Sequence, residues 1–228
     1  MSGPMRAKLI VVEGIDGSGK GTQTARLAET LRDQGAAIAE LTFPRYAETR
    51  YGRLIGRFLA GEFGSLDSTA PELTALLFAG DRFESKSVLS EAAAASDFVL
   101  CDRYAASNVA HQAGRLQGER QTRLIEFLDW LEFELHGLPR PDLTLWLDVP
   151  PEVSQANILQ RAAGGRAVDI AERDLSHLAA SAAVYGQLAD DSNWLRIACA
   201  TQTSEPQMRS PDAIAEEITA AVLERFAV

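Results

Sequence analysis

The sequence predicts an α/β fold in which a parallel sheet of five strands carries helices on both faces. Five short apolar runs have the composition of buried strands, and long alanine-rich segments of helical periodicity separate them. Strands that alternate with helices form parallel sheets, which are covered on both faces in a three-layer sandwich. The expected strands are Lys8–Glu13, Ala37–Phe43, Phe98–Asp102, Leu143–Val149 and Trp194–Ala200.

Apolar spacing and proline or glycine punctuation place the helices and turns. The first strand runs into a glycine-rich turn and then into a helix over Gly21–Gln34, where Leu27 and Leu31 lie one turn apart. Pro44 and Gly137–Pro141 are expected to lie in loops or turns. A C-terminal helix is expected to pack on the sheet through one stripe. That stripe consists of Ile214, Ile218 and Val222.

A short polar segment, Arg161–Arg166, is rich in glycine and interrupts the helical pattern. It lies between a helix expected to start near Pro151 and another expected near Asp169. Glycine disfavours helix and leaves the backbone free to move. We therefore expect a lid at about residues 160–172, within a single domain over residues 1–228.

The charge of the chain argues against nucleic acid as a partner. The net charge is -10, whereas duplex-binding proteins need a basic face to displace counterions from phosphates. Only three of the 22 Lys and Arg residues are lysines, so arginine must supply the positive charge for any small anionic substrate. Genomic composition bias is the alternative explanation for this excess of arginine.

The cysteines, the histidines and the hydropathy of the chain argue against a zinc-binding protein and against a membrane protein. Cys101 and Cys199 lie in apolar runs, as small buried residues do. His111, His136 and His177 are widely spaced, with no Cys or Glu at a ligand spacing, so no structural zinc site is expected. No apolar stretch reaches the roughly 20 residues that span a bilayer, and the N-terminal residues lack the apolar core of a signal peptide. We expect a cytoplasmic protein with no membrane partner.

A phosphate-binding loop is the clearest motif in the sequence. The residues GIDGSGKGT, from Gly14 to Thr22, match the pattern G-x-x-x-x-G-K between an expected strand and an expected helix. Glycines let consecutive N–H groups point at a phosphate, the helix N-terminus adds partial positive charge, and Lys20 reaches the β- and γ-oxygens. ATP is therefore expected to bind through Gly14, Gly17, Ser18, Gly19, Lys20, Gly21 and Thr22.

One position of the loop departs from the usual pattern. The residue after the lysine normally supplies a Ser or Thr hydroxyl to Mg²⁺, but here it is Gly21, followed by Thr22. The Gly-Lys-Gly-Thr form resembles the loop of adenylate kinases, in which the metal is held largely through waters and acidic side chains. Mg²⁺ stays the expected cofactor, with acidic side chains as its ligands.

Further segments stand in a recognisable order along the chain. They are Glu13-Gly-Ile-Asp-Gly, Phe43-Pro-Arg-Tyr, Leu77-Phe-Ala-Gly-Asp-Arg82, Asp102-Arg-Tyr-Ala-Ala-Ser-Asn108 and Gly137-Leu-Pro-Arg-Pro-Asp142. Together, in their order and approximate spacing, they resemble the thymidylate kinase family over nearly the whole chain. The resemblance implies a P-loop NTPase fold, transfer of the γ-phosphate of ATP to dTMP to give dTDP and ADP, and a homodimer.

The resemblance assigns dTMP contacts. It implies that Asp16 accepts a hydrogen bond from the 3′-hydroxyl, Arg45 contacts the phosphate, Phe78 stacks on thymine and Arg82 donates to O4. Phe78 and Arg82 are four residues apart, so they share one helix face. Without the family, Phe78 is interpreted as a core residue, and a surface arginine after a turn is the alternative for Arg45. The other expected contacts are Phe43, Arg103, Ser107, His111, Asp169 and Asn108, which faces N3 and O2.

The resemblance also assigns the chemistry. Asp102 follows an apolar strand, so it emerges at the carboxyl edge of the sheet, where ligands bind. It resembles the Walker B acid that orients Mg²⁺, although a helix cap is the alternative. Arg103 is implied to bridge the donor and acceptor phosphates. The expected metal ligands are Asp16, Asp102 and Glu172, and the expected catalytic residues are Lys20, Arg103, Asp16 and Arg166.

Two positions differ from the family pattern. His111 replaces the usual Tyr that crowds the sugar 2′ position, so preference for deoxyribose is not predicted. Gly17 carries no arginine, which suggests that the catalytic arginine comes from the lid, and we choose Arg166 over Arg161.

Two other functions are weighed. The loop also fits another small-molecule kinase, such as an adenylate kinase, but the further segments disfavour it. A non-catalytic ATP-binding regulator would keep the loop and lose transfer. The presence of Asp16, Lys20, Asp102 and Arg103 argues against a regulator.

Overall fold

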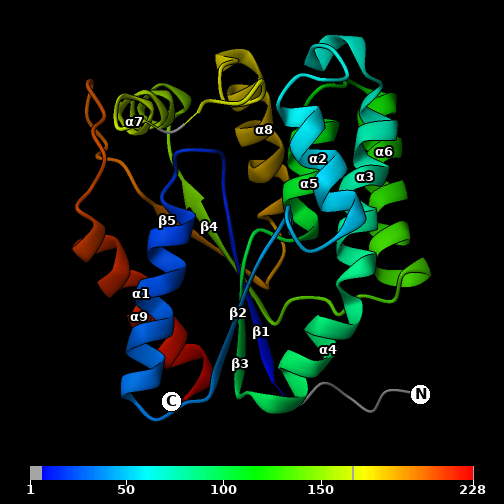
Figure 1. Cartoon of the computed structure of the whole chain (residues 1–228). Helices are drawn as coiled ribbons and strands as arrows, with labels where there is room; N and C mark the ends of the chain where they lie inside the picture. Colours follow the sequence, from blue (N-terminus) through cyan, green and yellow to red (C-terminus); the bar gives the residue numbers. More distant parts are fainter. Residues whose placement is uncertain (1–6, 166, 228) are drawn as a thin grey trace.

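A five-stranded parallel sheet forms the centre of the structure (Figure 1), a computed structural model that describes residues 7–165 and 167–227. The strand order is β2-β3-β1-β4-β5, and every neighbouring pair is parallel. The predicted α/β fold with five parallel strands is therefore confirmed, and each strand agrees with its expected position to within two residues at either end. The strands are β1 (Lys8–Glu13), β2 (Ile38–Thr42), β3 (Phe98–Asp102), β4 (Leu143–Asp148) and β5 (Trp194–Ala198).

Helices cover both faces of the sheet, with α1 and α9 on one side and α2 to α6 on the other (Figure 1). A π-helical segment, η2, continues α6, and a 3₁₀ turn, η1, precedes α3. The helices are α1 (Lys20–Asp33), α2 (Arg50–Leu59), η1 (Leu66–Ser68), α3 (Pro71–Glu84), α4 (Lys86–Ala95), α5 (Ala105–Ala113), α6 (Glu119–Asp129), η2 (Trp130–Leu135), α7 (Pro151–Ala163), α8 (Leu175–Leu188) and α9 (Pro211–Phe226).

Both faces of the sheet are apolar because side chains alternate along a strand and both faces are buried. On β1, Ile10 and Val12 join the core under α1 and α9, whereas Leu9 and Val11 join a second core on the opposite face. The expected stripe of α9 is buried in the first of these cores. In the described ranges, no helix combines the length and apolar character needed to cross a membrane.

One expected helix boundary is wrong. The helix expected to start near Asp169 starts at Leu175, as α8, and residues before it form turns. The Asp169 carboxylate accepts hydrogen bonds from the backbone N–H groups of Ala171 and Glu172, each at 2.8 Å, which ties this stretch into a turn. Asp174 then caps α8 by accepting from the backbone N–H of His177 at 3.1 Å.

Candidate active site

A cavity of about 420 Å³ lies at the carboxyl ends of β1, β2 and β3, where open α/β sheets bind ligands. It brings most of the predicted site residues together. Gly14, Ser18 and Arg45 are not among its lining residues, and Arg166 lies outside the described residues. The predicted residues that line it are Asp16, Gly17, Gly19, Lys20, Gly21, Thr22, Phe43, Phe78, Arg82, Asp102, Arg103, Ser107, Asn108, His111, Asp169 and Glu172.

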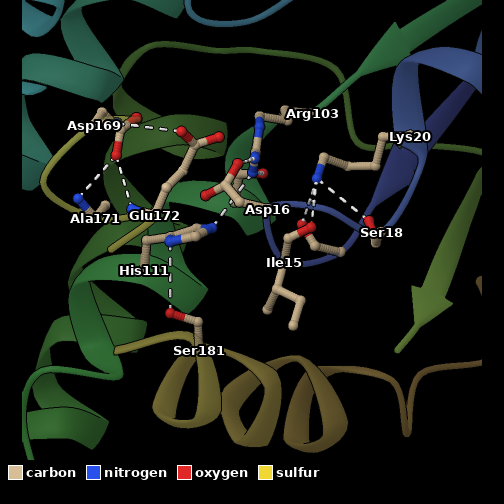
Figure 2. Close-up of polar contacts among 12 residues, drawn as sticks. Ile15, Asp16, Ser18, Lys20, Arg103, His111, Asp169, Ala171, Glu172 and Ser181 are labelled. Carbon is tan, nitrogen blue, oxygen red and sulfur yellow. Dashed lines mark hydrogen bonds and ion pairs between the residues drawn. The ribbon is translucent and has the colours of Figure 1, made fainter. Parts of the chain in front are cut away.

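The phosphate loop connects β1 to α1 at one end of this cavity. Its Gly17 and Gly19 have φ values of 83° and 93°, a left-handed backbone that glycine adopts without strain. The Lys20 ammonium folds back and donates to the carbonyl oxygens of Gly14 at 2.9 Å and Ile15 at 2.8 Å (Figure 2). Burial, together with the charge of Arg103, lowers the pKa of Lys20 to about 8.

The first turns of α7 brace the loop from outside. Asn157 donates to the Gly17 carbonyl oxygen at 3.0 Å, and the Ser154 hydroxyl donates to the Asp16 carbonyl oxygen. A Cβ at position 17 would lie 2.4 Å from the Ser154 carbonyl oxygen, so the contact with α7 excludes any side chain there. Sequence reasoning missed Ser154 and Asn157, because their contact with the loop crosses more than a hundred residues of chain.

Asp16 and Arg103, which both line the cavity, form an ion pair (Figure 2). Arg103 has a φ of 68°, a strained conformation for a residue other than glycine, and such strain concentrates at functional sites. Its guanidinium also donates to the Ser107 hydroxyl at 3.2 Å. Burial alone would raise the pKa of Asp16, but Arg103 and Lys20 outweigh it and hold that pKa well below its usual value. Asp16 is therefore an anion that accepts hydrogen bonds.

A buried carboxylate, Glu13, holds the segment that carries Arg103. It ends β1 and is fully buried. It accepts from the backbone N–H groups of Tyr104 at 2.8 Å and Ser107 at 3.1 Å, and from the hydroxyl of Tyr185 at 2.9 Å. These bonds fix the start of α5 against β1. Sequence reasoning missed Glu13 as a site residue, although a charged residue at the end of an apolar strand was an available signal.

Two histidines that are distant in the sequence meet beside the ion pair. His111 Nδ1 lies 3.1 Å from His177 Nε2, and His111 Nε2 lies 3.4 Å from the Arg103 guanidinium. Burial lowers the pKa of both imidazoles. The pair therefore adds little positive charge near pH 7. His177 was not predicted as a site residue, since nothing in its local sequence indicates the contact.

The far end of the cavity combines an aromatic ring with two polar side chains. Phe78 and Arg82 extend from α3, and Asn108 extends from α5. Phe78 also packs against the small core of Phe58, Leu66 and Ala171, so it contributes to that core as well as to the cavity. A flat aromatic face beside a guanidinium and an amide suits a planar, polar-edged ring such as a nucleobase.

Carboxylates around the phosphate end could hold a divalent cation. Asp102 Oδ1 is buried, and the described residues supply no hydrogen-bond partner for it. A Cβ at Gly21 would lie 3.2 Å from Asp102 Oδ2, so glycine keeps this carboxylate accessible from the loop. An unpaired carboxylate oxygen is the ligand type that Mg²⁺ prefers, so Asp102 fits the expected metal. The described residues contain no ready-made group of three or more ligating side chains.

Residues 160–172, where the lid is expected, bring two acids, Asp169 and Glu172, and one described arginine to the cavity lining. Burial and the neighbouring Asp16 and Glu172 raise the pKa of Asp169 to about 6, although hydrogen bonds from the backbone oppose the shift. Arg161, in the last turn of α7, lines the cavity. Tyr46 lines it too and was not predicted. Arg45 instead donates through its backbone N–H to Asp81 at 3.0 Å.

The fold and this cavity define a P-loop phosphotransferase, with a triphosphate-binding loop at one end and a pocket for a planar ring at the other. The sequence profile of thymidylate kinases matches residues 12–209. The chain belongs to the thymidylate kinase family.

Relatives support this membership. The chain is 36% identical over 183 residues to a thymidylate kinase of Mycobacterium tuberculosis strain H37Rv, covering 79% of this chain and 85% of the relative. A Bordetella petrii thymidylate kinase is 34% identical over 170 residues, or 74% of each chain. The solved structure of a Candida albicans thymidylate kinase superposes with a TM-score of 0.69, covering 97% of this chain and 93% of that one. At 22% identity it confirms the fold.

Proposed function

We propose that this chain transfers the γ-phosphate of MgATP to dTMP, giving ADP and dTDP for dTTP synthesis. One observation carries the proposal: a single cavity joins the phosphate loop to the pocket formed by Phe78, Arg82 and Asn108, and the Asp16–Arg103 ion pair lines the same cavity. Family membership points to the same reaction.

Phosphoryl transfer here depends on positioning and charge, because the acceptor phosphate is already an anionic nucleophile and needs no general base. Lys20 and Arg103 offset the charge that develops on the transferred group. A lid arginine completes this set, with Arg166 as our choice. We propose that the lid, about residues 160–172, closes over the substrates and excludes water, which suppresses hydrolysis of ATP.

Mg²⁺ is the proposed cofactor, and Asp16, Asp102 and Glu172 would hold it. When bound, it neutralises charge on the β- and γ-phosphates. The unpaired Oδ1 of Asp102 supports this assignment. Gly21 carries no hydroxyl, so we propose that water molecules mediate most of the protein's contacts with the ion.

The acceptor contacts follow the family pattern. Asp16 accepts from the 3′-hydroxyl, Arg45 contacts the phosphate, Phe78 stacks on thymine, Arg82 donates to O4 and Asn108 reads N3. Phe43, Arg103, Ser107, His111 and Asp169 complete the dTMP site. Arg45 lies outside the cavity lining and its guanidinium donates to the Ser85 hydroxyl at 3.5 Å, so its side chain would turn toward the substrate on binding.

We propose that the chain acts as a cytoplasmic homodimer of single-domain subunits. The adjacent helix α3 and the α6–η2 helix expose large apolar side chains, which on a soluble protein mark an interaction surface. Sedimentation at micromolar concentration tests the assembly. The exposed residues are Leu73, Leu76, Phe83, Phe127, Trp130 and Leu135.

An ADP-release assay across dTMP, dUMP, UMP, AMP and CMP tests the reaction. We expect dTMP to give the highest kcat/KM. AMP as the best acceptor would assign the chain to the adenylate-kinase type. Nucleotide binding without turnover of any acceptor would indicate a regulator.

A further inference from the structure

A fully buried ion pair lies behind the ring pocket. Glu132 is 0% exposed and Arg82 is 2% exposed. Arg82 Nε donates to Glu132 Oε2 at 3.0 Å, and Arg82 Nη2 donates to Glu132 Oε1. A buried pair contributes less to stability than an apolar pair of the same volume in many proteins, because both charges lose their hydration. A role in stability alone is therefore a weak explanation for this pair.

The same carboxylate also fixes the amide of Asn108. Asn108 Nδ2 donates to the Ala75 carbonyl oxygen at 2.9 Å and to Glu132 Oε1 at 3.3 Å. Both partners are acceptors, so the NH₂ group must face them and the amide cannot flip. The amide oxygen, Asn108 Oδ1, therefore points away from these two acceptors. It is buried and has no hydrogen-bond partner among the described residues.

Glu132 belongs to η2, the π-helical segment that continues α6. The backbone N–H of His136 donates to the Leu131 carbonyl oxygen at 2.9 Å, the five-residue spacing of a π-helix. Such segments are rare and are frequent at functional sites. Glu132 lies four residues after Leu128 and eight after Leu124, both buried, so it continues the buried stripe of α6.

We propose that Glu132 is the positioning residue that sets the base specificity of this enzyme. It holds the Arg82 guanidinium as a fixed donor and, with the Ala75 carbonyl, holds Asn108 Oδ1 as a fixed acceptor. This pair matches the imide edge of thymine or uracil, where N3–H donates and a carbonyl oxygen accepts. The same donor and acceptor do not match cytosine, because its N3 is an acceptor that would face Asn108 Oδ1 and its amino group is a donor that would face Arg82. The inference rests on the proposed function, which supplies the acceptor base.

Glu132→Gln tests the proposal, because glutamine keeps the volume but removes the charge that holds both partners. We expect the KM for dTMP to rise tenfold or more, with kcat within about threefold of wild type and the KM for ATP unchanged. The ratio of kcat/KM for dTMP to that for dCMP should fall at least tenfold, the scale of one misplaced hydrogen bond. Wild-type selectivity in the folded variant would overturn the proposal.

Glu134→Gln is the matched control, since Glu134 lies in the same π-helical segment with its side chain 66% exposed. It should leave both KM values and the selectivity at wild-type levels. Equal losses in both variants would mean that η2 acts only as a structural element, and the proposal would fall.

Two further measurements cover the case in which Glu132→Gln does not fold. Glu132→Asp keeps a charge beside Arg82 but withdraws it by one methylene, so the KM for dTMP should rise twofold to tenfold without a change in kcat. In the wild-type protein, N3-methyl-dTMP should bind at least tenfold more weakly than dTMP, since the methyl group meets Asn108 Oδ1. Equal binding of the two ligands, or wild-type KM and selectivity in Glu132→Asp, would overturn the proposal. Absence of dTMP turnover by the wild-type enzyme would instead overturn the proposed function.

Discussion

The two ends of the cavity are built in opposite ways. The phosphate end is one continuous segment, Gly14–Thr22, whose shape comes from glycine backbone conformations and the start of α1. The ring end is assembled from side chains on α3, α5 and η2, held by a buried ion pair. A local structure of the first kind can be recognised in a sequence, whereas a non-local one depends on the fold that brings its parts together. Substitutions at the two ends should therefore have different effects on turnover, stability and substrate affinity.

Loss of the loop's ammonium is expected to have the largest effect. Lys20→Met should lower kcat with dTMP at least about a thousandfold, because no other group in the loop can offset charge on the transferred phosphate. Thermal unfolding should show an intact fold, since methionine fills the volume left by the buried lysine stem. Steady-state kinetics measure the loss, and wild-type turnover would contradict the role of the loop. Arg26→Met, on an exposed side chain of α1, is the control.

The contact between the loop and α7 is expected to have the next largest effect. Gly17→Ala requires a side chain at a φ of 83° and 2.4 Å from the Ser154 carbonyl oxygen, so it should cost about 2–4 kcal/mol of the free energy of unfolding. Gly35→Ala has the same backbone strain, at a φ of 90°, with nothing within 4 Å of the added Cβ. It should cost about 1 kcal/mol. Equal losses in urea denaturation would show that α7 does not brace the loop.

The sequence predicts the local parts of this molecule well. All five strands and the phosphate loop follow from apolar runs and glycine spacing, because their determinants are neighbours in the chain. Glu13, Glu132, Ser154 and His177 escape prediction, since each acts through partners at least 24 residues away. The start of α8 was misplaced because the Asp169 side chain binds two backbone N–H groups and forms a turn, a competing interaction that helical periodicity does not report.

A third prediction concerns Asp169, an acid in the lining of the cavity. The pKa of Asp169 is about 6 in the folded chain against 3.8 for the ordinary side chain, so the folded state disfavours the ionised form. Ionisation of Asp169 therefore lowers the free energy of unfolding. This loss is absent below pH 3.8, grows as the pH rises from 3.8 to about 6, and is up to about 3 kcal/mol at neutral pH. Asp169→Asn keeps the acceptor oxygen and removes this loss. Its gain in the free energy of unfolding should therefore be larger at pH 8 than at pH 5.

Chemical denaturation at several pH values measures this gain. Asp190→Asn, at an exposed position before β5, should change stability equally at both pH values. A gain for Asp169→Asn that is independent of pH would mean that Asp169 is not desolvated beside Asp16 and Glu172. The part of the cavity wall that carries Asp169 would then be open to water.

The smallest expected effect is that of Phe78, which lines the cavity and also packs against the small core of Phe58, Leu66 and Ala171. If its ring stacks on the base, Phe78→Ala should raise the KM for dTMP by about tenfold to a hundredfold, the worth of about 1–3 kcal/mol for one stacked base, and leave the KM for ATP unchanged. Phe83→Ala, five residues further along α3 at a 52% exposed residue, should change neither KM. Equal increases in both KM values for Phe78→Ala would identify a core residue whose loss loosens both ends together, and the cavity would then be one cooperative unit instead of two separately built halves.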